Sequence, residues 1–176
     1  MKIAIKKNKQ VLRFLLIFTA SYAILYFFYF LLIKNSNEID FFTKTVSNQT
    51  VKSLNFIGYE TYTKIDPTNN FVRLFVRNKN IASIIEGCNA VSVMILFAAF
   101  IFSFFKDLKS TIIYSLAGVF IIHVMNILRI IIIIICMYHF PDYSMLLHEY
   151  VFPITIYGVV FLLWMFWVKS FQTKKQ

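Results

Sequence analysis

Three side chains that could support nucleophilic catalysis stand where apolar stretches of the chain meet polar ones. Cys88 lies where a long polar segment ends, Arg129 lies within a later apolar run, and His148 precedes the last apolar run. A histidine within reach of a thiol favours the nucleophilic thiolate, and a guanidinium supplies fixed donors to the oxyanion of a tetrahedral intermediate. These residue types together would suit acyl transfer on a peptide bond just outside a bilayer.

Each of these residues also has a non-catalytic interpretation. A cysteine at such a place can be a small inert residue, an arginine near the head groups can snorkel, and a lone histidine is commonly an interfacial filler. An arginine at membrane depth is costly, which favours a functional role for Arg129. Neighbouring polar residues are supporting candidates, namely Asn89, Asn126 and Glu149. Weaker catalytic candidates are His123 and His139, while Cys136, inside an isoleucine run, is expected to be inert.

The composition indicates an integral membrane protein with a single membrane domain, residues 1–176. Hydrophobic residues make up 59% of the 176, above the ~45–50% of soluble domains. The net charge of +10 lies largely in clusters beside apolar runs. Such clusters set topology and meet anionic lipid, so we expect membrane lipid and no nucleic acid as a partner. No metal-ligand spacing surrounds the two cysteines, and no metal or organic cofactor is expected.

Four apolar runs are long enough, or nearly so, to cross the ~30 Å hydrocarbon core as helices. Basic residues flank the first run on its N-terminal side, the turn at residues 106–109 and the C-terminal end, which favours cytoplasmic termini. Cys88 then faces the outer side. The predicted fold is an all-α polytopic membrane protein, N-in and C-in, with about four spans at residues 11–33, 89–105, 111–138 and 150–168.

Residues 34–87 form the one substantial polar region and are predicted to be extracytoplasmic. Apolar residues recur at roughly helical spacing over residues 38–57. Turn residues at 66–70 and 78–80 bound a β-branched stretch at 71–76, and residues 81–85 follow. This pattern predicts a small β-hairpin leading directly to Cys88, with a solvated loop as the alternative.

The third predicted span is longer than one crossing requires. Arg129 would lie roughly 28 Å from Thr111 along a straight helix, close to the outer boundary. The apolar run at residues 130–135 lies beyond Arg129. Either the helix tilts, so that Arg129 faces a wet cavity in the bundle, or it breaks near Asn126 and re-enters the membrane. We favour the tilted helix.

The motifs at these positions resemble those of the exosortase/archaeosortase family. Glu-Gly-Cys88-Asn89-Ala90 opens one span, Asn126-Ile-Leu-Arg129 lies in the next, and Leu-His148 precedes the last. The resemblance covers residues 71–169, and the short chain looks most like the exosortase F type. It implies an inner-membrane protease and transpeptidase with Cys88 as nucleophile, Arg129 as transition-state stabiliser and His148 as general base and acid. The chain differs in having only the four-span core, and Leu147 stands where many relatives carry a second histidine.

The resemblance also implies substrates and a location. The substrates would be exported proteins that end in a short motif, a membrane helix and a basic tail, and the acceptor would be water or an amine of a lipid or glycan. The site would face the periplasmic side of a bacterial inner membrane, with an accessory membrane protein as a further partner.

Two other functions remain as alternatives. A non-enzymatic assembly or scaffold subunit of an envelope export system would tolerate changes at Cys88, Arg129 and His148 but not at the helix-packing glycines Gly118 and Gly158. A transporter fragment fits poorly, because the chain has no pair of broken helices in matching halves.

Overall fold

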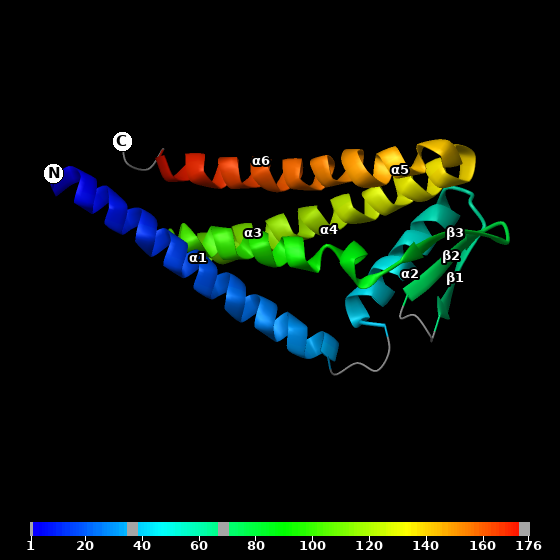
Figure 1. The fold of residues 1–176 in the computed structure, drawn as a ribbon, viewed down its shortest axis with the longest axis horizontal. Helices are drawn as coiled ribbons and strands as arrows, with labels where there is room; N and C mark the ends of the chain where they lie inside the picture. Colours follow the sequence, from blue (N-terminus) through cyan, green and yellow to red (C-terminus); the bar gives the residue numbers. More distant parts are fainter. Residues whose placement is uncertain (1, 35–38, 67–70, 173–176) are drawn as a thin grey trace.

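Long helices form a bundle with a small α/β subdomain at one end (Figure 1). The computed structural model describes residues 2–34, 39–66 and 71–172. The predicted turn residues 67–70 and the C-terminal Lys174 and Lys175 lie outside these ranges. The bundle helices are α1 (Lys2–Lys34), α3 (Val91–Ser103), α4 (Leu108–His139) and α6 (Phe152–Gln172). The start of α1 and the end of α6 lie at the same end of the bundle, opposite the subdomain (Figure 1).

The subdomain consists of one helix and a three-stranded antiparallel sheet. Its elements are α2 (Phe41–Phe56), β1 (Thr61–Asp66), β2 (Phe71–Val76) and β3 (Lys79–Ile84), with strand order β1-β2-β3. The Asp40 carboxylate begins α2 by accepting from the backbone N–H of Thr43 at 2.9 Å. Where the sequence predicts a hairpin, the structure has β2 and β3; β1 is an additional strand. Arg77 and Asn78, with φ of 45° and 66°, form the two-residue turn between β2 and β3.

One face of the sheet packs against both α2 and the second half of α4. Alternate residues of β2 are buried, and Leu54 of α2 joins them. Ile130 and Ile134 of α4 are 5% and 1% exposed in the same core. One side of the apolar run beyond Arg129 therefore packs against the subdomain, while Ile132 on another side is exposed, and α4 continues through the run as one helix. Since ~20 residues cross the hydrocarbon, the 32-residue α4 has enough length to span it and still reach the subdomain.

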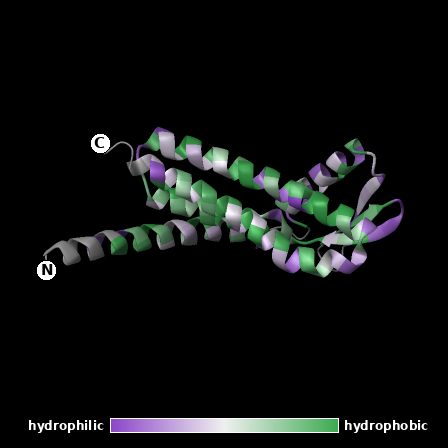
Figure 2. Ribbon diagram, turned by 90° about the horizontal axis from the view of Figure 1, so that it is seen from above, coloured by the Kyte–Doolittle hydropathy of each residue, from purple (hydrophilic) through white to green (hydrophobic). Residues whose placement is uncertain are grey.

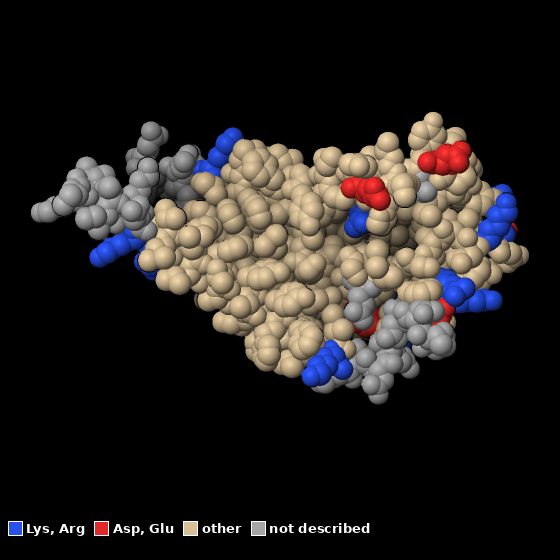
Figure 3. Space-filling model, viewed as in Figure 1, with Lys and Arg blue, Asp and Glu red and all other residues tan. Residues whose placement is uncertain are grey.

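Among the described residues, three helical stretches are long and apolar enough to cross a membrane: Val11–Lys34, Leu108–His139 and Pro141–Ser170. The predicted span at 89–105 is shorter as a helix, since α3 covers only Val91–Ser103. Residues Glu86–Asn89 instead form a 3₁₀ turn, η1, and Ala90 is left-handed with φ of 57°. Hydrophilic residues gather at the subdomain end (Figure 2), and charged side chains lie mostly toward the two ends of the face in Figure 3. These features confirm a helical membrane protein.

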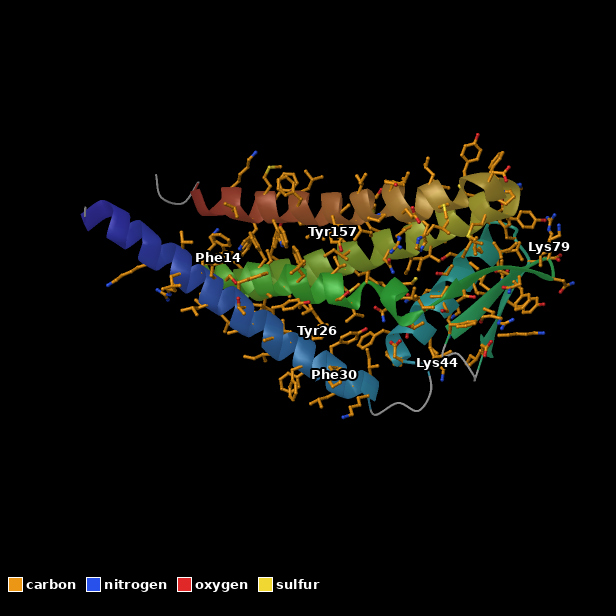
Figure 4. The ribbon with its side chains drawn as sticks, in the orientation of Figure 1. Phe14, Tyr26, Phe30, Lys44, Lys79 and Tyr157 are labelled. Atoms are coloured by element: carbon orange, nitrogen blue, oxygen red, sulfur yellow. The ribbon has the colours of Figure 1, made fainter. Side chains whose placement is uncertain are left out.

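The bundle core lies between α3, α4 and α6. Phe97 of α3 is fully buried and lies against Gly118 of α4, at a place where a Cβ would collide with the Phe97 ring. In contrast, none of the spanning window of α1 is buried. Helix α1 contacts α3 through aromatic pairs: the ring centroids of Phe14, labelled in Figure 4, and Phe100 are 5.9 Å apart.

Candidate active site

A cavity of about 140 Å³ brings together the three residues singled out from the sequence. Cys88 comes from η1, Arg129 from α4 and His148 from the turn before α6. The remaining lining comes from β3 and from apolar residues of α4: Ala82, Ser83, Ile84, Ile130, Ile133, Ile134 and Met137. Cys88 and Arg129 are half-buried and His148 is exposed. The cavity thus offers a thiol, a guanidinium and an imidazole to one small ligand group.

The backbone N–H and C=O of Cys88 are both hydrogen-bonded to other residues, which holds Cys88 in place. The Cys88 N–H donates to the Ile85 carbonyl at 2.9 Å, and the Cys88 carbonyl accepts from Asn126 Nδ2 at 2.8 Å. The residue therefore sits on a short, pinned turn between β3 and α3. Its thiol is free, as is that of Cys136.

Asn89 anchors the same turn to three helices. Its side chain is 2% exposed, and its Nδ2 donates to Tyr29 Oη of α1 at 3.2 Å and to Thr43 Oγ1 of α2 at 3.3 Å. Its Oδ1 accepts from the Val91 N–H at 3.0 Å, which begins α3. Tyr29 and Thr43 are site-supporting residues that the sequence analysis missed. Tyr29 lies among other aromatic residues of an apolar run, where nothing distinguishes it.

Asn126 connects Cys88 with Arg129. The two α4 residues lie three apart and share a face of the helix. Arg129 Nη1 lies 3.4 Å from Asn126 Oδ1, while Asn126 Nδ2 bonds to Cys88. Asn126 is fully buried. One amide side chain therefore sets the position of the cysteine turn relative to the arginine.

His148 and Glu149 lie in a π-helical turn, η3 (Leu147–Val151), which follows the short elements η2 (Pro141–Tyr143) and α5 (Ser144–Leu146). Pro153 explains the turn, because proline has no N–H for the Glu149 carbonyl and its ring clashes with that group. The side chains of His148 and Glu149 are both exposed. Glu149 is not among the described residues that line the cavity.

The other two histidines have partners elsewhere. The Nε2 of His123 lies 2.8 Å from Gln49 Oε1 of α2, and the Nε2 of His139 lies 2.9 Å from Tyr59 Oη. Cys136 lines a separate cavity with residues that include Phe140 and Leu147. Within the described part of the chain, no three His, Cys, Asp or Glu residues are close enough to hold a metal ion.

The fold and the site define a class: a helical membrane protein with a thiol, a guanidinium and an imidazole around one cavity beside its α/β subdomain. Residues 9–169 match the family model described as transmembrane exosortase (Exosortase_EpsH). The chain belongs to this family, which confirms at family level the resemblance drawn from the motifs. No curated protein and no solved structure matches the chain significantly.

Proposed function

We propose that the protein is a membrane cysteine peptidase and transpeptidase that cleaves C-terminal sorting signals of exported proteins. The observation that carries the proposal is the shared cavity: Cys88, Arg129 and His148 are distant in sequence and come from three elements, yet they line one small space. Membership of the exosortase family supports a role in protein sorting.

In the proposed reaction Cys88 is the nucleophile, Arg129 binds the oxyanion and His148 acts first as a base and then as an acid. His148 takes the proton of the Cys88 thiol, and the sulfur forms a bond to the carbonyl carbon of the scissile peptide. Arg129 stabilises the oxyanion of the tetrahedral intermediate. When the C–N bond breaks, His148 returns the proton to the leaving amine and a thioester remains. Water or an acceptor amine then attacks the thioester, giving up a proton through His148 and releasing Cys88.

The proposal includes an orientation in the membrane. The helix ends at the N-terminus and the C-terminus lie together, and the subdomain with the cavity beside it lies toward the other end (Figure 1). We place both termini in the cytoplasm of a bacterial cell and the site at the periplasmic face of the inner membrane, with α3 as the fourth, short span. The same proposal assigns the protein to the exosortase F type. It also includes contacts with lipid, an accessory membrane protein as a partner, and no requirement for a metal or cofactor.

Trapping the thioester tests the proposal directly. The protein is co-expressed with a candidate substrate that carries a motif, an apolar helix and a basic tail, and adducts are probed with hydroxylamine, which cleaves thioesters. We expect an adduct on the wild type and on the matched control Cys136→Ser, and none on Cys88→Ser. Normal processing in a stably expressed Cys88→Ala variant would contradict the proposed function.

A further inference from the structure

Strand β3 is an edge strand that leads directly into the cysteine turn. In the sheet order β1-β2-β3, β3 pairs with β2, and no strand among the described residues pairs with its other side. An edge strand directs alternate N–H and C=O groups away from the sheet, where they can pair with another extended chain. After Ile84 only Ile85 intervenes before η1, which contains Cys88.

The cavity lies between β3 and α4, with Cys88, Arg129 and His148 in its wall. Ala82, Ser83 and Ile84 all line it. Successive side chains of a strand point to opposite faces, and Ile84 lies in the core shared with α2 and α4 whereas Ser83 is exposed. Three consecutive residues can contact one cavity most simply where it follows the backbone edge. That edge is therefore directly beside Cys88 and Arg129.

The part of β3 that lines the cavity, residues 82–84, has no charge, proline or irregularity that would block pairing. Edge strands are commonly protected by charged residues, proline or β-bulges, and the irregularity in the β2–β3 pairing, at Leu74/Phe75, comes before Ala82 on β3. Residues 80–84 contain no charged residue and no proline, and the one charge of the strand, on Lys79, lies at the end of the sheet farthest from the two termini (Figures 1 and 4). By contrast, β1, the opposite edge, carries Lys64 and Asp66. The two edges thus differ in sequence, and the edge strand without charge or proline at residues 80–84 lines the cavity, whose opposite wall is α4.

We propose that β3 binds the segment to be cleaved as an added parallel strand, which places the scissile carbonyl beside Cys88. The inference rests on the proposed function and its orientation. Main-chain pairing of this kind supplies affinity with little dependence on side chains. The cavity has a volume of about 140 Å³, so it accommodates one side chain or peptide group while the rest of the segment follows the rim.

The parallel direction follows from two chain directions. Strand β3 runs from Lys79, at the end of the sheet farthest from the two termini, toward the middle of the molecule (Figures 1 and 4). The turn that contains Cys88 follows at that end of the strand. In a substrate whose motif precedes its membrane helix, the chain also runs toward the membrane. Two strands that both run toward the bilayer are parallel, which leaves residues near Ile84 opposite the substrate residues nearest the scissile bond.

Site-specific photocrosslinking in the full-length protein tests this inference. In a Cys88→Ala background, benzoylphenylalanine replaces Asn80 or Ser83 on β3, Met137 on the α4 wall of the cavity, or Ile65 on the opposite edge strand. The probes are the cell's own exported proteins that end in an apolar helix and a basic tail, and adduct positions are mapped by mass spectrometry. We expect adducts from 80 and 83 in the segment just before the apolar helix, and none above background from 65.

The order of the adducts is the critical result. Parallel pairing places the residue captured from 80 N-terminal to that captured from 83, by about three residues or ~10 Å of strand. The reverse order overturns the parallel arrangement. Capture of the same segment from 137 but not from 80 or 83 overturns strand addition and leaves the proposed function intact. Capture of no such segment from any cavity position overturns both.

Discussion

Asn126 is the residue through which the cysteine motif and the arginine motif are coupled. It is fully buried, donates to the Cys88 carbonyl at 2.8 Å and lies 3.4 Å from Arg129 Nη1. The i, i+3 relation of Asn126 and Arg129 is visible in the sequence. The bond to Cys88, by contrast, depends on how α4 is rotated against η1, which no single-sequence pattern specifies. The roles of all three residues in catalysis stay predictions.

Replacing Asn126 should impair the site through geometry. In Asn126→Leu the Cys88 carbonyl loses its partner, which costs ~1–3 kcal/mol, and the cysteine turn is released from α4. We expect adduct formation to fall by about tenfold or more, since ~1.4 kcal/mol corresponds to a factor of ten, together with a lower unfolding temperature in detergent. Gln49→Leu is the matched control because it also removes a polar contact of α4, in this case the hydrogen bond between Gln49 of α2 and His123 of α4. It should lower stability without slowing adduct formation; equal slowing in both variants would contradict a specific role for Asn126.

The exposed imidazole of His148 should be visible in the pH dependence of activity. If it transfers the proton, His148→Gln should lower the rate by about 100-fold or more, the usual contribution of a general base. A general base acts only in its deprotonated form, so the shape of the pH–rate profile should change as well. The control is His139→Gln, whose imidazole bonds to Tyr59 outside the cavity. A pH profile of His148→Gln identical in shape to that of the wild type would rule His148 out as the base.

Among the elements, the π-helical turn η3 positions His148, and a single proline accounts for it. Without Pro153, the Glu149 carbonyl would gain an N–H partner at the normal helical spacing. In Pro153→Ala we expect the turn to tighten into α-helix, which rotates His148 away from the cavity. The expected result is a slower reaction with an unchanged or higher unfolding temperature. Ile154→Val, whose side chain is exposed on α6, should change neither; loss of stability without loss of rate in Pro153→Ala would refute this account of the turn.

The periodicity of apolar residues predicts where helices and strands lie better than it predicts whether lipid or protein packs against them. The run at residues 130–135 is apolar enough for lipid, but Ile130 and Ile134 pack against the subdomain; both environments select the same residues, so composition does not separate them. Strand β1 was missed because its residues alternate weakly, with Lys64 and Asp66 among threonines. The shortened α3 depends on Ala90 adopting φ of 57°, a conformation that alanine does not signal.

At the scale of the whole molecule, the bundle and the subdomain meet at the level of the site. Helix α4 belongs to both cores, through Ile122 on the bundle side and Ile130 on the subdomain side, with Asn126 between them. Asn89 connects α1, α2 and α3 at the same level. The buried amides Asn89 and Asn126 thus lie where the two apolar cores meet, and they fix the cysteine turn through uncharged groups.

The scaffold alternative and the enzyme proposal can be separated by packing variants, because the structure distinguishes the two glycines. A Cβ at Gly118 meets the Phe97 ring, whereas one at Gly158 has nothing within 4 Å. Overpacking typically costs ~1–3 kcal/mol, so Gly118→Ala should lower the unfolding temperature and Gly158→Ala should not. Adding Phe97→Leu should restore part of the loss, because the two residues are in contact and their effects are not additive.

Processing of a tail-signal substrate in the same variants gives the decisive comparison. An enzyme requires Cys88 even when the bundle is intact, so Cys88→Ala should unfold like the wild type and process nothing. In Gly118→Ala, the remaining folded protein should still process substrate in proportion to its amount, and the Phe97→Leu double variant should recover that amount. A scaffold predicts the opposite pattern, with full function in Cys88→Ala and loss of function that follows packing alone. Measuring folded protein and processed substrate in each strain therefore separates chemistry at the cavity from assembly by the helices.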